Sequence, residues 1–149
     1  MNNKIIIAVR ILFGLGLIVF GGMSFLNLPI PDFYPPEAIS FLESLADTGY
    51  INPIIGIIFI IVGLMFVFGM YVALGTILLA PILVNILLFH IFYDLGSIIP
   101  GLIFSLLNIF IAYTEWDKYK PLLRRKWKEK KKIGNAIQLY ATVQDAYTD

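Results

Sequence analysis

The stretch APILVNILLFHIFYD, which covers residues 80–94, decides the fold of this chain. It is apolar enough to form the second half of a helix that crosses a membrane. It also contains His90, the only histidine of the chain. Polar and ionisable residues inside such helices are rare and are functional candidates by default. We therefore expect this helix to form a wall of any ligand site within the membrane.

The composition of the whole chain indicates an integral membrane protein. Of its 149 residues, 59% are hydrophobic, compared with about 45–50% in a typical soluble domain. The apolar residues occur in uncharged blocks of about 20 residues, the length of a helix that spans the hydrocarbon core. The chain has no cysteine, which excludes thiol relays, thiolate metal sites and cysteine-bound iron–sulfur clusters.

We predict an all-α membrane domain over residues 1–123, built as a bundle of four transmembrane helices. The spans are expected at about residues 5–27, 51–68, 72–92 and 98–116. Pro81 lies inside the third span and should kink it.

Glycines are spaced for close helix packing in the first two spans. Gly14 and Gly21 are seven residues apart, and so are Gly56 and Gly63. Residues at this spacing share one face of a helix, and small residues on that face let another helix approach closely.

A short helix is predicted between the first and second spans. Pro36 suits its first turn, and Gly49 suits the position that ends it. Apolar residues recur at helical spacing on one side, whereas acids and serines occupy the other. About a dozen residues are too few to span, so we expect a short amphipathic helix on the outer side, flat on the membrane or over the mouth of the bundle.

The charge pattern predicts the orientation of the spans. Every lysine and arginine lies before residue 11 or after residue 117, and the two connections on the other side carry only acids. By the positive-inside rule, both the N- and C-termini are cytoplasmic. Two cytoplasmic termini require an even number of spans, in agreement with four.

Charged and amide residues are predicted at several depths within the spans. Arg10 and Glu115 lie at similar depth on the cytoplasmic side. We expect a structural ion pair between them, or extension of each charged group to the interface. Asn85 and Asn108 lie deeper and are expected to form hydrogen bonds between helices.

His90 and Asp94 are four residues apart, so they share a helix face at the outer end of the third span. Together with Asn85 they form a hypothetical ligand-binding pocket on the outer side. Two roles remain open for His90: a structural or interfacial role, and binding of a quinone head group or another small ligand. No metal site is expected, because one histidine and no cysteine cannot supply three nitrogen or sulfur ligands. No residue is assigned a catalytic role.

After the fourth span the composition becomes strongly basic. The basic residues nearest to the span are Lys118, Lys120, Arg124, Arg125 and Lys126. Such a cluster beside a membrane helix is attracted to anionic lipid headgroups. We expect it to contact headgroups or a partner subunit rather than nucleic acid. Residues 124–149 are predicted to form a basic cytoplasmic tail, which is either disordered or ordered by a partner.

Three blocks of sequence carry a family resemblance: Thr48-Gly49-Tyr50-x-x-Pro53-x-x-Gly56, Ala80-Pro81-x-x-x-Asn85-x-x-x-Phe89-His90 and Tyr119-x-Pro121-Leu122. From about Arg10 to Leu123, the chain resembles the DoxX-like family of small four-helix bacterial membrane proteins. The resemblance implies a location in the bacterial cytoplasmic (inner) membrane. It also implies a link with quinone-reducing thiosulfate oxidation or with membrane-bound oxidoreductase complexes.

Two departures from the family pattern affect the expected function. Ser24 and Phe59 stand about where family members often carry a lysine and a glutamate. Without that charged pair, the leading hypothesis is a non-catalytic accessory or structural subunit of a larger membrane complex.

Two other functions remain open. The first is a quinone-interacting component of an oxidoreductase system, with His90 as proton partner, Asp94 orienting it and Asn85 donating a hydrogen bond. No cofactor is expected to be bound covalently in either case. A small-solute transporter is a weaker hypothesis, because the chain shows neither an internal repeat nor a charged pathway.

Overall fold

The computed structural model describes residues 3–26, 28–123, 133–140 and 144. These residues form helices and the turns between them, and none of them lies in a β-strand. The predicted all-α class is therefore confirmed for this part of the chain. The chain divides into two units, Met1–Trp116 and Asp117–Asp149, which are described separately.

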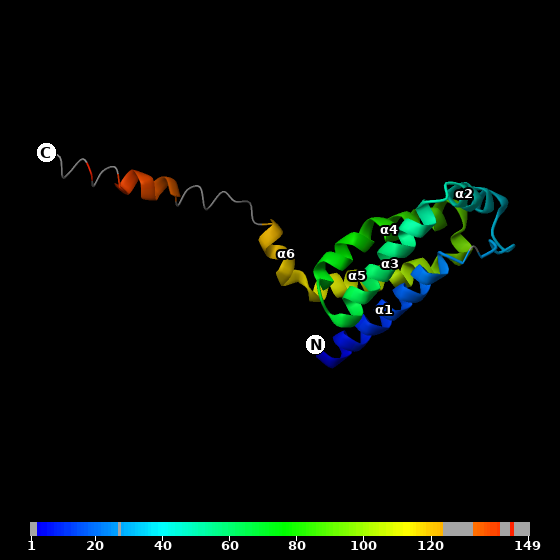
Figure 1. Ribbon diagram of the computed structural model, residues 1–149, viewed down its shortest axis with the longest axis horizontal. Coiled ribbons are helices and arrows are strands. Elements are labelled where there is room, and N and C mark those ends of the chain that lie inside the picture. Colours follow the sequence, from blue (N-terminus) through cyan, green and yellow to red (C-terminus); the bar gives the residue numbers. More distant parts are fainter. Residues whose placement is uncertain (1–2, 27, 124–132, 141–143, 145–149) are drawn as a thin grey trace. The chain divides into compact units, whose positions relative to one another are not determined.

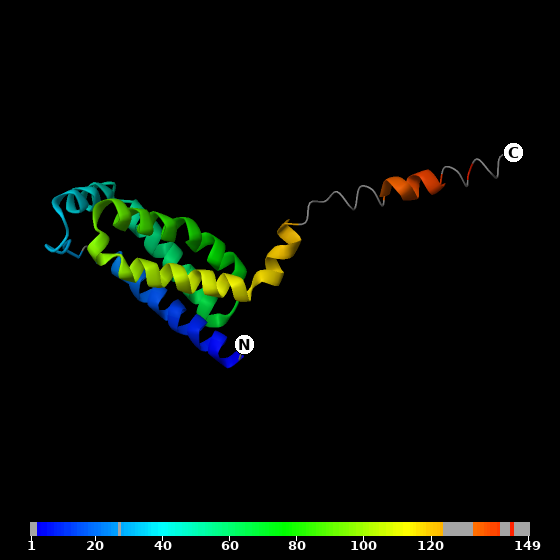
Figure 2. The same cartoon turned by 180° about the vertical axis from the view of Figure 1, so that it is seen from behind.

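Four long helices make up the first unit. They lie side by side, each antiparallel to its neighbour in sequence, in both views of the bundle (Figures 1 and 2): α1 (Asn3–Met23), α3 (Ile51–Phe68), α4 (Val72–Tyr93) and α5 (Ile99–Thr114). The shorter α2 (Pro36–Asp47) lies at the end of the bundle opposite the N-terminus. A one-turn 3-10 helix, η1 (Leu95–Ser97), joins α4 to α5.

Helices α1, α3 and α4 are long and apolar enough to cross a membrane, whereas α5 is apolar but has only 16 residues. The bounds of α3 agree with the predicted span. Helix α1 ends at Met23, four residues earlier than predicted. It ends there because the next N–H groups, from Ser24 to Leu26, bond to carbonyls three residues back and turn the chain.

Two glycine pairs bring α1 and α3 together, as their spacing predicts. Gly14 faces Gly63, and Gly21 faces Gly56. A Cβ added to Gly63 would lie 2.6 Å from the carbonyl oxygen of Gly14, and one added to Gly21 would lie 2.7 Å from that of Gly56. Backbone atoms occupy the space that larger side chains would need, so glycine sets this helix separation.

Large apolar side chains fill the centre of the bundle. Phe13 of α1 packs against Phe66 of α3, with ring centroids 5.6 Å apart. The same cluster draws on all four long helices and includes the fully or almost fully buried Leu17, Val62, Val72, Leu79, Leu83 and Ile111. This core fixes the four helices as one bundle.

The tight link between α3 and α4 is covered by Arg10. Gly69 ends α3 in the left-handed conformation, with φ at 71°, and its N–H donates to the carbonyl oxygen of Met65. A Cβ on Gly69 would lie 2.6 Å from a terminal nitrogen of the Arg10 guanidinium. Backbone conformation and packing therefore both favour glycine at this position.

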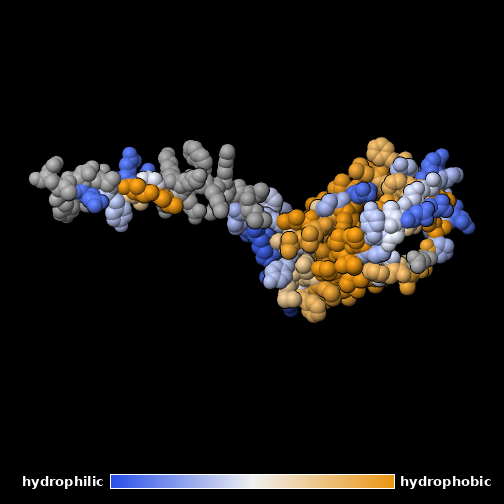
Figure 3. Space-filling view, turned by 45° about the horizontal axis from the view of Figure 1, so that its top comes forward, coloured by the Kyte–Doolittle hydropathy of each residue, from blue (hydrophilic) through white to orange (hydrophobic). Residues whose placement is uncertain are grey.

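The outer surface of the bundle is apolar. Leu12, Val19, Phe68 and Ile109 each expose between 61% and 69% of their surface. Hydrophobic residues cover most of the face seen in Figure 3, and hydrophilic residues gather near the α2 end. Exposed apolar surface of this extent contacts lipid or another protein, which agrees with a membrane protein.

The second unit contains most of α6 (Trp116–Leu123) and a helix over residues 133–140. Lys120 Nζ lies 2.5 Å from Asp117 Oδ1, one turn earlier on α6. Both side chains are largely exposed, so this ion pair contributes little to stability.

Candidate functional site

A cavity of about 320 Å³ lies within the bundle beside His90. We call it the His90 cavity. Its walls come from α1, the loop before α2, α3, α4, η1 and α5, through Phe20, Phe33, Tyr34, Phe59, Leu83, Ile86, His90, Ser97, Pro100, Gly101 and Phe104. Its volume lies near the lower end of the roughly 300–1,000 Å³ typical of small-molecule sites.

Aromatic and aliphatic side chains line most of the His90 cavity. Phe104 of α5 meets Phe20 of α1 edge to face, with ring centroids 5.1 Å apart. Phe59 of α3 is buried on another side. The polar side chains in the lining are His90, Ser97 and Tyr34. Apolar walls with a few polar groups suit a largely apolar ligand that has a polar end.

Hydrogen bonds at the end of α4 fix the orientation of His90. Its Nδ1 lies 3.3 Å from the backbone oxygen of Asp94 and 3.3 Å from Oγ of Ser97. The Ser97 hydroxyl donates in turn to Oδ2 of Asp94. One residue from η1 therefore joins the imidazole and the carboxylate, which the helix alone places one turn apart.

These partners determine which ring nitrogen carries hydrogen. A carbonyl oxygen only accepts, and the single hydroxyl hydrogen of Ser97 is used on Asp94, so Nδ1 of His90 must donate to both. In the neutral imidazole this leaves Nε2 as an acceptor. No hydrogen bond joins Nε2 to any residue that the structure describes. Because His90 lines the cavity, its Nε2 is a polar atom that could accept a hydrogen bond from a ligand there, in addition to the Tyr34 hydroxyl.

The cluster does not have the arrangement of a serine nucleophile. In a catalytic triad the carboxylate accepts from one imidazole nitrogen, while the serine bonds to the other. Here Ser97 bonds to Nδ1 and the Asp94 carboxylate bonds to the hydroxyl. The arrangement can hold an imidazole in place, but it cannot activate the Ser97 hydroxyl in the manner of a triad.

An aromatic stack holds α2 against the end of α4. Phe41 of α2 stacks on Phe89 and on Tyr93, with ring centroids 5.5 Å and 5.0 Å apart. Phe89 also meets the His90 ring edge to face, at 5.1 Å. The position of α2 is thereby coupled to that of His90.

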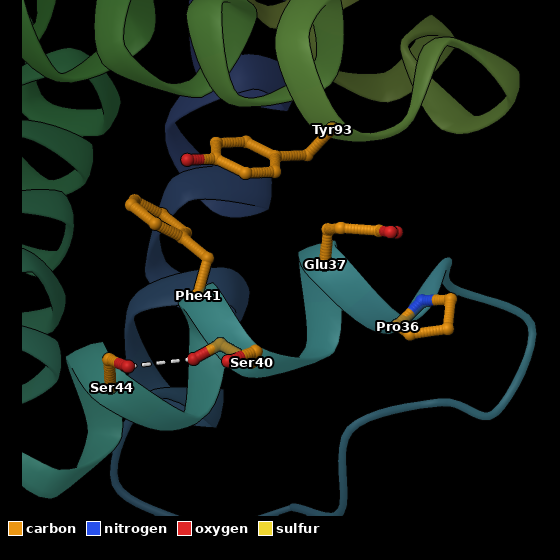
Figure 4. Close-up of a pocket in the computed structure, with 6 residues that line it drawn as sticks. All are labelled: Pro36, Glu37, Ser40, Phe41, Ser44 and Tyr93. Atoms are coloured by element: carbon orange, nitrogen blue, oxygen red, sulfur yellow. Dashed lines mark hydrogen bonds between the residues drawn. The ribbon is translucent and has the colours of Figure 1, made fainter.

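A second hollow, open and shallow, lies between α2 and Tyr93. Figure 4 shows the Phe41 ring pointing toward Tyr93, with Glu37 and Ser40 on neighbouring turns. Ser44 Oγ donates to the backbone oxygen of Ser40 at 2.7 Å. The polar groups here are exposed, so we regard the His90 cavity as the better candidate site.

The structure brings together two of the three residues predicted for the outer pocket. His90 and Asp94 are joined through Ser97, but Asn85 lies elsewhere: its side chain is exposed on the outside of α4 and does not line the His90 cavity. Asn85 and His90 are five residues apart, which is about 500° around the helix, so the two side chains point about 140° apart. Asn108, by contrast, is buried and donates to the backbone oxygen of Thr76 at 3.2 Å.

The ion pair predicted between Arg10 and Glu115 stays a prediction. Both side chains are partly buried, as their predicted positions imply. The guanidinium of Arg10 lies against Gly69 at the end of α3, where the free carbonyls of a helix terminus favour a cation. Arg10 and Gly69 are far apart in the sequence, so the sequence alone does not predict this contact.

The predicted lipid-contacting residues fall in the second unit. Lys118 and Lys120 lie on α6 and are exposed. Arg124, Arg125 and Lys126 lie outside the described residues. Within the described ranges, no group of three His, Cys, Asp or Glu side chains is placed to hold a metal ion.

Sequence reasoning missed Ser97 and Tyr34. Ser97 follows Asp94 by three residues and His90 by seven, a spacing that identifies it once the chain is known to turn into a 3-10 helix there. Tyr34 comes from the loop before α2, and no local pattern predicts its place in the cavity wall. Comparisons with protein families, with curated proteins and with solved structures find no match to this chain.

Proposed function

We propose that this chain is a DoxX-like protein of the bacterial inner membrane that acts as an accessory subunit of a larger membrane complex. In this proposal α1, α3, α4 and α5 are four spans, α2 lies on the outer side as an amphipathic helix, and both termini are cytoplasmic. The charge pattern of the sequence supports this orientation: every lysine and arginine lies before residue 11 or after residue 117, whereas α2 carries only acids.

Helix α5 is the shortest of the four proposed spans. Its 16 residues are about 24 Å long at 1.5 Å per residue, somewhat less than the hydrocarbon core of about 30 Å. Tyr113 and Trp116 are exposed near its end, where aromatic side chains anchor spans at the interface. Local thinning of the bilayer accommodates a mismatch of this size at modest cost.

The observation that carries the subunit proposal is the position of Asn85. It is the fourteenth residue of the 22 in α4, so it lies near the middle of the proposed span, and its side chain is exposed on the outside of the bundle. It makes no side-chain hydrogen bond to any residue the structure describes. An amide in hydrocarbon is stabilised by a hydrogen bond from a second helix, with typical values of about 0.6–2 kcal/mol.

Extraction in gentle detergent tests the proposal. We expect the wild-type chain to be recovered with a partner subunit, and Asn85→Leu to lose that partner while keeping its own thermal stability. Val84→Ala is the matched control, because Val84 is the adjacent exposed residue and carries no polar group. Recovery of the wild-type chain alone, or an Asn85→Leu variant that keeps its partner, contradicts the proposal.

A second candidate function is quinone binding in the His90 cavity. The observation that favours it is an apolar cavity of about 320 Å³ with an orientated imidazole in its wall. A quinone or quinol head is a flat ring with hydrogen-bonding oxygens, and Nε2 of His90 would accept from its hydroxyl form. Electrons would come from another protein, so this function also involves a complex.

Titration with a short-tailed quinol tests this second function. We expect His90→Ala to weaken binding about tenfold, the effect of losing one hydrogen bond of about 1.4 kcal/mol. Thr76→Ala is a control, because Thr76 is buried on the same helix but does not line the cavity. Equal affinity in the wild-type and His90→Ala proteins rules the site out.

A further inference from the structure

The helix over residues 133–140 has one apolar face and one polar face. At 100° per residue, its apolar side chains fall within an arc of about 160°: Ile133, Ala136, Ile137, Leu139 and Tyr140. Gly134, Asn135 and Gln138 occupy the opposite side. The sequence alone showed only scattered apolar residues here, and the helix gathers them on one face.

The apolar side chains of this face are exposed among the residues of the second unit that the structure describes. Ile133, Ile137, Leu139 and Tyr140 expose 60%, 65%, 68% and 76% of their surface. A helix of eight residues is too short to be stable in water by itself, because nucleation is unfavourable below about 12 residues. A surface that buries the apolar arc would stabilise the helix.

The charge of the preceding segment indicates which kind of surface covers the apolar face. Directly before the helix, residues 124–132 contain seven basic residues and one acid: Arg124, Arg125, Lys126, Lys128, Lys130, Lys131, Lys132 and Glu129. Basic residues next to a membrane helix attract anionic headgroups by about 1 kcal/mol each, and this attraction falls off within a Debye length. A protein partner would need a matching acidic surface, whereas an anionic bilayer is already present beside the spans.

We infer that residues 133–140 bind an anionic membrane surface, with their apolar arc in the interface, and that the positive charge of the preceding sequence attracts them to the headgroups. Because the helix belongs to the same chain as the proposed spans, its effective concentration at that membrane is high and even weak affinity suffices. The site is specific for anionic lipid, because the basic run supplies most of the attraction. It rests on the proposal that the bundle spans a membrane, and it holds whether the bundle acts as an accessory subunit or binds a quinone.

Spin labelling of the full chain tests this inference directly. The chain has no cysteine, so Ile137→Cys and Asn135→Cys each carry a single label, on the apolar and polar faces respectively. The protein is placed in nanodiscs of phosphatidylcholine alone, or with one-third phosphatidylglycerol. In anionic nanodiscs we expect the label at 137 to be relaxed mainly by oxygen, which partitions into lipid, and the label at 135 mainly by a water-soluble nickel complex.

Charge removal provides the second arm. The double variant Lys131→Gln, Lys132→Gln should lower the ratio of membrane-bound to free helix about 25-fold. Each lost charge contributes a factor of about five, which corresponds to about 1 kcal/mol. Labels at 135 and 137 that are equally exposed to water in anionic nanodiscs would overturn the inference. Protection of the label at 137 that is equally strong in neutral nanodiscs at high salt would also overturn the inference, because the helix would then not be bound to an anionic bilayer.

Discussion

His90 is held in place by Ser97, a residue that lies in η1 outside the α4 helix. The side chain of His90 is buried, and Ser97 Oγ accepts from its Nδ1 while donating to Asp94. Removing one member of such a network leaves buried polar groups without a partner, which is more unfavourable than the loss of one hydrogen bond in water.

The Ser97→Ala variant tests this dependence. We expect the free energy of unfolding in detergent to fall by about 0.5–1.5 kcal/mol, the typical net contribution of one hydrogen bond, because Nδ1 of His90 keeps the backbone oxygen of Asp94 as a partner. Thermal unfolding followed by circular dichroism measures the change. Ser40→Ala is the control, because Ser40 is exposed on α2 and is expected to show little effect. Equal stability of the Ser97→Ala and wild-type proteins would mean that the network is not structural.

The two membrane asparagines show why residue type alone does not assign a role. Asn108 of α5 is buried and bonds to α4, whereas Asn85 of α4 is exposed. Sequence reasoning expected both to bond between helices. Only Asn108 does so within the described chain. The sequence could not distinguish the two, because apolar residues lie on both sides of Asn85 and do not show which face of the helix is buried.

At the scale of the helices, the α1–α3 contact depends on backbone atoms. Gly63→Ala places a Cβ 2.6 Å from the Gly14 oxygen and 2.7 Å from Ile18. The helices must then move apart, which we expect to lower the free energy of unfolding by about 1–3 kcal/mol, as for other overpacked cores. Chemical denaturation in mixed micelles measures this loss.

Gly22→Ala is the matched control for that substitution. Gly22 lies on the same helix as Gly14, but a Cβ added there meets nothing within 4 Å. Alanine also favours a helix over glycine by about 1 kcal/mol, so this variant should be as stable as the wild type or more so. If both variants were equally destabilised, the loss would not come from the glycine contact.

Helix α2 should detach when its aromatic contact is removed. Phe41→Ala deletes two ring contacts, to Phe89 and Tyr93, each worth about 0.5–1.5 kcal/mol beyond burial. We expect cleavage by a glutamate-specific protease within α2 to become at least about fivefold faster. A loss of about 1 kcal/mol in the docking of α2 raises the detached fraction about fivefold. Ser44→Ala, an exposed position on the same helix, should leave the rate unchanged. An unchanged rate for Phe41→Ala would show that other contacts hold α2.

For the whole molecule, the periodicity and length of the apolar blocks were more informative than individual polar residues. Apolar block length predicted the helix bounds to within a few residues, and the glycine spacing predicted the α1–α3 face. The candidate cavity was predictable only through His90, because its other walls come from six elements that meet in three dimensions. Arg10 likewise lies against Gly69, a partner that is remote in sequence.

The orientation of the whole chain remains the prediction on which the functional proposal depends. Because the chain lacks cysteine, single variants can be labelled with a maleimide that does not cross membranes. In intact spheroplasts we expect Ser44→Cys on α2 to react and Lys120→Cys on α6 to react only after permeabilisation, since positive charge is retained inside. Both residues are exposed, so a lack of reaction reports the side of the membrane rather than burial. Reaction of both cysteines in intact spheroplasts would place α2 and α6 on one side of the membrane, which the three proposed spans between them, α3, α4 and α5, do not permit.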